Sequence, residues 1–222
     1  MAATLDYSAL GQHVQPEQRK EHYLVISTPS SEVPCTRWRR CHKRWKCQDC
    51  CDYLGQQEAK TQLERLATYA CSGRWLVSLT PPPLPSLRDS VELLLSAWKA
   101  VTRQITYARV GRMIQGALCD SLLDILGGFA SVHPKRTVGG WHSHIHAIIA
   151  SPSVPDILGA WQRVTYTPAH VHVEPVKPTW LDIKKAATYC VCFDLPPSID
   201  DQLELKRVLE RKKLIRSFGV NF

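Results

Sequence analysis

The sequence contains no apolar run near the roughly 20 residues that a helix needs to cross a bilayer. Its opening stretch, MAATLDYSALGQHVQPEQRKEHY, lacks the basic-then-apolar layout of a secretory signal. No GxxxxGK[ST] loop is present, so an intrinsic nucleotide-driven motor is not expected. These absences predict a soluble, cytoplasmic protein with no membrane partner. In that compartment the nine cysteines are expected to be metal ligands or buried thiols rather than disulfides.

The composition is that of a folded domain with a basic surface. The chain has 222 residues, of which 44% are hydrophobic and 22% charged, enough for one ordinary core with a small appendage. The formal net charge of +8 favours a polyanionic partner.

The chain divides into three predicted parts: a flexible arm over 1–33, a cysteine-rich zinc-binding module with a helix over 34–70, and the main domain over 71–222. In the main domain, strand patterns and amphipathic helices interleave without the rhythm of parallel crossovers. The segment FASVHP is expected to pair with 141–150 through the turn KRTVGG. An α+β fold follows, with helices packed on an antiparallel sheet.

Three histidines alternate in the segment GGWHSHIHAII. A strand turns successive side chains to opposite faces, so His142, His144 and His146 are expected to share one face. Three imidazoles in a row pack poorly in a core but are good ligands for a divalent ion. A metal site is favoured over a surface strand with incidental histidines.

A second metal site is predicted near the N-terminal end. Its expected ligands, which suit a tetrahedral structural Zn²⁺, are Cys35, Cys41, Cys47 and Cys50. Cys51 or His42 is an alternative for one of the four. Basic and aromatic residues interleave with these cysteines, a pattern that suits contact with phosphates and unpaired bases. The predicted DNA contacts are Arg37, Arg39, Arg40, Arg44, Trp45 and Lys46.

Several motifs together resemble rolling-circle plasmid replication initiators (Rep proteins) of the HUH endonuclease superfamily. GWHSHIH is similar to their GWHPHLH motif, and WLVSLTPP to the strand FLTLT with its proline-rich exit. LLLSAWKAV, ATYCVCFDL and ERKKLIRSFGV resemble the helix that carries Ala-Trp, the tyrosine helix and the closing segment. RWKCQDCC resembles the cysteine element near the start of such proteins. The resemblance spans about residue 35 to the end.

The resemblance implies a single-strand DNA endonuclease and strand transferase of prokaryotic plasmids. A helix-borne tyrosine would attack one phosphate of single-stranded or hairpin origin DNA, become joined to the 5′ side, and leave a 3′-OH for synthesis. Mg²⁺ or Mn²⁺ is the implied catalytic ion. A host helicase and polymerase are the implied partners.

Tyr189 occupies the position of the family's nucleophile. The family's Tyr-x-x-Lys pattern is broken, because Cys192 stands where the lysine is usual. Lys185 lies one helical turn before Tyr189 on the same face and is expected to take over its electrostatic role. Asp182, a further turn back, is the only nearby carboxylate expected on this face.

The third ligand of the catalytic ion remains open between His133 and His142, because the preceding strand lacks the acid that the family often supplies. An all-imidazole set would suit Mn²⁺ or Zn²⁺ better than Mg²⁺. Three other readings compete with the initiator. They are a transposase or relaxase with the same chemistry, a zinc-dependent DNA-binding protein with a decayed nuclease site, and an unrelated tri-histidine metallohydrolase.

Overall fold

The computed structural model describes residues 47–71, 73–111 and 122–219. Their elements follow in the order α2 (Gln48–Ala67), β1 (Arg74–Thr80), α3 (Leu87–Arg109), β2 (Gly127–His133), β3 (Arg136–Thr137), β4 (Gly140–Trp141), β5 (His144–Ala150), α4 (Ile157–Val164), β6 (His170–Pro175), α5 (Trp180–Val191), α6 (Ile199–Leu209) and β7 (Ile215–Gly219). Among these helices, none is both long and apolar enough to span a membrane.

Five strands form one antiparallel sheet in the order β6-β1-β5-β2-β7. The predicted α+β class with an antiparallel sheet is therefore confirmed, as is the pairing of FASVHP with the histidine strand. The more specific likeness to HUH endonucleases is not decided by this topology and stays a prediction.

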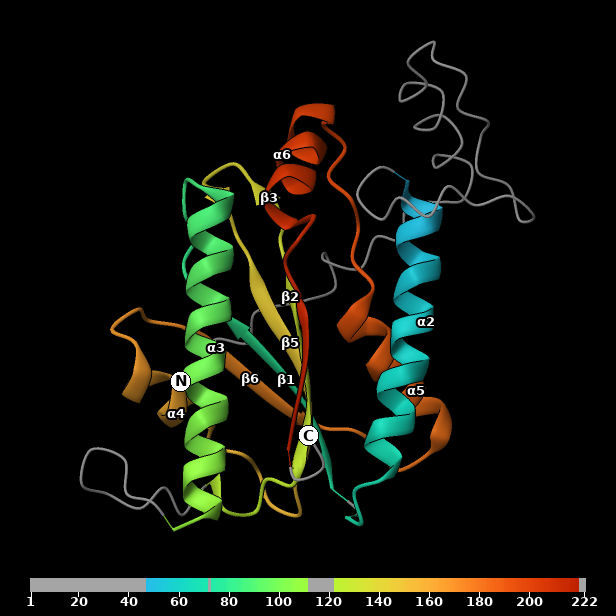
Figure 1. Cartoon of the computed structure of the whole chain (residues 1–222), viewed down its shortest axis with the longest axis vertical. Helices are drawn as coiled ribbons and strands as arrows, with labels where there is room; N and C mark the ends of the chain where they lie inside the picture. Colours follow the sequence, from blue (N-terminus) through green and yellow to red (C-terminus); the bar gives the residue numbers. More distant parts are fainter. Residues whose placement is uncertain (1–46, 72, 112–121, 220–222) are drawn as a thin grey trace, which may run out of the picture.

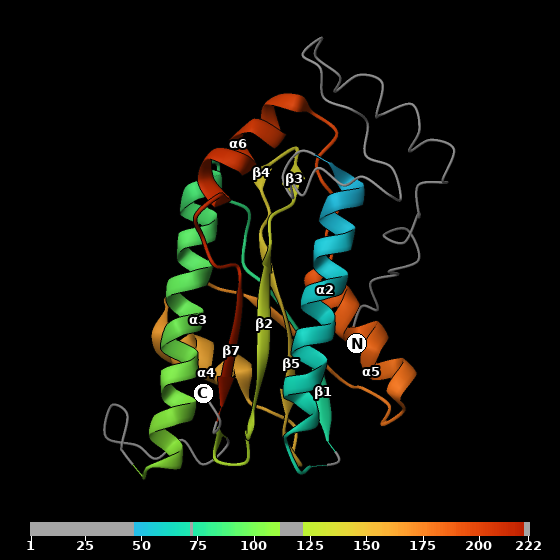
Figure 2. The same cartoon turned by 45° about the vertical axis from the view of Figure 1, so that its right-hand side comes forward.

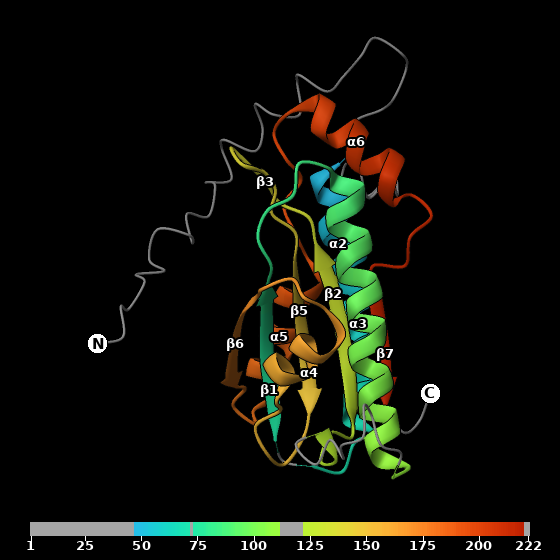
Figure 3. The same ribbon diagram turned by 90° about the vertical axis from the view of Figure 1, so that its left-hand side faces the viewer.

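Helices cover both faces of the sheet, as Figures 1 and 3 show. On one face α3 and α4 pack against inward residues such as Val77 and Ala147. On the other face α2 and α5 pack against the alternate residues, such as Leu76 and Ile148. This alternation of apolar side chains is what the period of two in a strand requires when both faces are buried.

The strands β2 and β5 form a long hairpin that extends beyond the other strands. At its tip the short strands β3 and β4 pair with each other, and α6 lies across them (Figure 2). The indole Nε1 of Trp141 donates to Glu204 of α6 at 3.2 Å, and Arg136 pairs with Asp201 at 3.4 Å. These contacts fix the hairpin tip from which both β2 and β5 enter the site.

Short polar side chains cap the helices α3 and α4. Ser86 caps α3 by accepting from the amide of Asp89, and Asp156 caps α4 by accepting from the amide of Gly159.

The helix α2 begins at Gln48, so its first turn contains Cys50 of the predicted zinc motif. The helix α5, which carries Tyr189, ends at Val191. Residues 215–219, within the closing segment ERKKLIRSFGV, form the edge strand β7.

Candidate metal centre

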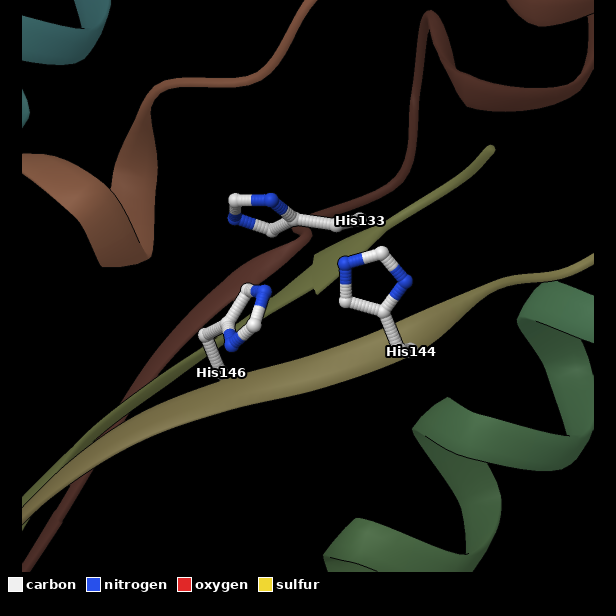
Figure 4. A group of neighbouring side chains, drawn as sticks. All are labelled: His133, His144 and His146. Atoms are coloured by element: carbon white, nitrogen blue, oxygen red, sulfur yellow. The ribbon is translucent and has the colours of Figure 1, made fainter. Parts of the chain in front are cut away.

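Three imidazoles converge on the face of the sheet that α2 and α5 cover. His133 ends β2 and lies directly opposite His144, the first residue of β5, and His146 follows two residues later on the same face. One nitrogen from each ring lies within 4.8 Å of the other two. Figure 4 shows the three rings facing one another from the two paired strands. In the part of the chain that the structure describes, this is the one such group of potential ligands.

In each of the three rings, one nitrogen contacts an oxygen atom of the chain. His133 donates from Nε2 to the carbonyl of Cys190 at 2.6 Å, and His144 contacts the carbonyl of His142 through Nδ1 at 3.4 Å. A carbonyl only accepts, so these nitrogens carry the hydrogen. His146 Nδ1 lies 2.9 Å from Ser78 Oγ. With Nδ1–H donating to Ser78, all three rings keep an unprotonated nitrogen for an ion, an arrangement typical of metal sites.

Burial keeps these rings neutral. It lowers the pKa of His133 to about 3, that of His144 to about 4 and that of His146 to about 2, with further lowering from neighbouring histidines. The neutral imidazole is the form that binds a metal. The donor set therefore fits a divalent cation, and the nitrogen ligands suit Mn²⁺ or Zn²⁺ better than Mg²⁺.

His142 does not belong to this group. The expected run of three alternating histidines is interrupted because β5 begins only at His144, and residues 142 and 143 lie between β4 and β5. The His142 amide donates to the Lys135 carbonyl at 2.8 Å. The alternation along β5 therefore places only His144 and His146 on this face. The pairing of β2 with β5 brings His133 beside them as the third histidine.

Tyr189 lies beside the same group. Its ring centroid is 4.5 Å from that of His146, while 53% of the residue remains exposed. The last turn of α5 carries Tyr189. This turn is fixed beside the histidines because its Cys190 carbonyl accepts a hydrogen bond from His133. Phe193, just after this helix, also contacts His133, with ring centroids 5.6 Å apart. A phenol and three imidazoles thus share one partly open site.

The two charged residues expected on α5 have different surroundings. Lys185 is exposed on the helix that carries Tyr189. Asp182 is engaged at the helix start, where Thr179 donates to its carboxylate at 2.6 Å and accepts from its amide at 3.1 Å. Thr179 is therefore the N-cap of α5, and the Asp182 carboxylate is occupied by the Thr179 hydroxyl.

Only part of the predicted zinc module can be placed. Cys47 is the N-cap residue of α2 and Cys50 is buried in its first turn. The other predicted zinc ligands and DNA contacts lie outside the described residues: Cys35, Cys41, Arg37, Arg39, Arg40, Arg44, Trp45 and Lys46. Of the predicted three-part division, the arm over 1–33 also lies outside them. The helix α2 packs on the sheet and on α5.

Sequence reasoning did not find Ser78 or Phe193. Ser78 lies opposite His146 across the β1–β5 pairing, a neighbour that only the register reveals. The polar residue inside the apolar run WLVSLT was the one available signal for it. Phe193 gave no signal, because an aromatic residue after a helix is an ordinary packing residue.

In comparisons with known proteins, no family model, no curated protein and no solved structure matched this chain. The resemblance to replication initiators therefore stays a prediction that rests on the motifs quoted above.

We expect replacement of His133, His144 or His146 by Gln to weaken Mn²⁺ binding at least about tenfold, since even partners that only orient a ligand contribute about 10–100-fold. Mn²⁺ is the better probe because thiolates favour Zn²⁺. Isothermal titration calorimetry measures the change. His142→Gln is the matched control and should bind as the unaltered protein does. An equal loss in that control would contradict the assignment of the three ligands.

We also expect the metal-free protein to lose stability as pH falls from 6.5 to about 4. In that window unfolded histidines, with a pKa near 6.5, take up protons, whereas the folded rings of His133, His144 and His146, with a pKa of about 3, 4 and 2, do not. Each such ring adds about 1.4 kcal/mol per pH unit to the slope of the unfolding free energy. His146→Gln should remove that amount, measured by urea unfolding in a chelator between pH 5 and 6. Equal slopes would contradict the burial of a neutral ring.

Proposed function

We propose that this protein is a rolling-circle replication initiator that nicks and rejoins one strand of origin DNA through a covalent bond to Tyr189. The observation that carries the proposal is the contact between the Tyr189 ring and His146, one of three converging imidazoles. A nucleophile beside a cation site, with the nucleophile half exposed, is what attack on a phosphodiester requires. The resemblance of the motif order to plasmid initiators supports the substrate, single-stranded or hairpin origin DNA.

The chemistry divides among few residues. A divalent cation held by His133, His144 and His146 would supply positive charge to a bound phosphate, whose own negative charge repels nucleophiles. The Tyr189 oxygen attacks phosphorus, a tyrosine–phosphate bond forms, and the bond from phosphorus to the 3′ oxygen breaks. The phenol's proton is balanced by the one gained at the released 3′-OH. Attack of that hydroxyl on the tyrosine ester reverses the step and rejoins the strand.

Lys185 is proposed to favour the phenolate. A phenol with a pKa near 10 is mostly protonated at neutral pH, so a nearby cation helps it to react. Lys185 is four residues before Tyr189 on α5, and such residues are neighbours on a helix surface. The engagement of Asp182 with Thr179 makes it a poor source of a base for activating water.

The sequence has no nucleotide-binding loop, so the proposed initiator would depend on host enzymes for unwinding and synthesis. A host helicase would unwind the plasmid and a host polymerase would extend the 3′-OH that the nick leaves. The predicted zinc module and its basic residues would add contacts to DNA phosphates and unpaired bases.

Tyr189→Phe should abolish a covalent adduct between the protein and a labelled single-stranded origin oligonucleotide in Mn²⁺, because the attacking oxygen is removed. The measurement is a shifted band in a denaturing gel. Tyr166→Phe is the control, since that tyrosine is fully exposed between α4 and β6, and it should form the adduct normally. Binding without any adduct by the unaltered protein would favour a decayed nuclease site. Cleavage insensitive to Tyr189 would favour a tri-histidine hydrolase.

Lys185→Met should slow adduct formation at least about tenfold, because it removes a charge that stabilises the phenolate while keeping the length of the side chain. Lys184→Met is the matched control on the same helix. Lys184 projects about 100° around the helix axis from Lys185, because an α-helix has 3.6 residues per turn, and its replacement should change the rate by less than about threefold. Equal rates for the two variants would show that Lys185 has no special role.

A further inference from the structure

The segment that follows Tyr189 lies between the three histidines of the candidate metal centre and α2. On the metal side, the Cys190 carbonyl accepts from His133 and the Phe193 ring lies 5.6 Å from the His133 ring. On the other side it meets the first turn of α2, which lies beside α5 on the same face of the sheet (Figure 1). The two helices approach so closely that a Cβ added at Gly55 would lie 2.6 Å from the Cys192 sulfur.

Gln48, the first residue of α2, makes the most specific contacts with this segment. Its Nε2 donates to the Phe193 carbonyl at 3.3 Å, and its Oε1 accepts from the Leu195 amide at 2.8 Å. Its Nε2 also donates to Asp52 at 2.7 Å, which fixes the side chain within its own helix. A side chain held in this way ties two backbone groups of the segment after α5 to α2, and Cys51 of the same helix also contacts the Phe193 carbonyl through Sγ at 3.6 Å.

Tyr189 lies in the last turn of α5, where such a restraint matters most. The helix ends at Val191, and Cys192 has already left the helical conformation. Terminal turns are the parts of a helix that open most readily, because their carbonyls lack partners within the helix. Opening of this turn would move the Tyr189 ring away from His146.

We propose that Gln48 is a positioning residue for Tyr189. By tying Phe193 and Leu195 to α2, it holds the last turn of α5 closed and keeps the phenol at the metal group. This inference rests on the proposed function, since the nucleophile is the group that is positioned. It assigns to α2, the helix that continues from the cysteine motif, a direct part in organising the site.

The test compares Gln48→Met with Gln56→Met, the same substitution at an exposed position of the same helix. Two measurements are made: the single-turnover rate of adduct formation in Mn²⁺, and the hydrogen exchange of a peptide covering 188–195. Loss of two hydrogen bonds of ordinary strength predicts an adduct rate about ten- to thirtyfold slower in Gln48→Met, with faster exchange of that peptide. Gln56→Met should leave both unchanged.

One further readout separates positioning from general destabilisation. The affinity for the oligonucleotide, measured by anisotropy with Tyr189→Phe as background, should stay within about threefold of the unaltered protein, and adduct rates are compared at saturating Mn²⁺ because His133 donates to the Cys190 carbonyl in the same turn. A parallel loss of adduct rate and DNA affinity would overturn the proposal, and so would an unchanged adduct rate, whatever the exchange shows. Absence of an adduct with the unaltered protein would instead overturn the proposed function, and this inference with it.

Discussion

The candidate site depends on the register between β2 and β5. In the observed pairing His133 lies directly opposite His144, and both strands turn these residues to the face covered by α2 and α5. A slip of one residue would turn His133 to the opposite face, because side chains alternate along a strand. The apolar residues enforce the register, since the same slip of β2 would move Val132 out of the core that α3 and α4 cover.

Burial gives this group its chemical character. The histidine rings lie at the boundary where the packed sheet gives way to the surface, so desolvation holds them neutral while Tyr189 beside them stays half exposed. One nitrogen of each ring contacts an oxygen of the chain, and one nitrogen from each ring lies within 4.8 Å of the other two. Without an ion these nitrogens gain little from facing one another, which is the physical reason for reading the group as a metal centre.

The site is assembled from three parts that are distant in sequence. The strands β2 and β5 supply the imidazoles, α5 supplies the phenol, and α2 contacts the end of α5 through Gln48 and Cys51. The hydrogen bond from His133 to Cys190 joins the first two parts directly. A change in the placement of α5 would therefore affect both Tyr189 and His133.

The sequence by itself determined the features that depend on local periodicity. The alternation around His144 and His146 and the tyrosine on a helix were both predictable, because strand and helix periods act over a few residues. Only the tertiary structure decided which histidine completes the group, that 215–219 joins the sheet, and that Gln48 contacts the end of α5. Those outcomes depend on strand register and helix packing between segments far apart in the chain, which no local pattern encodes.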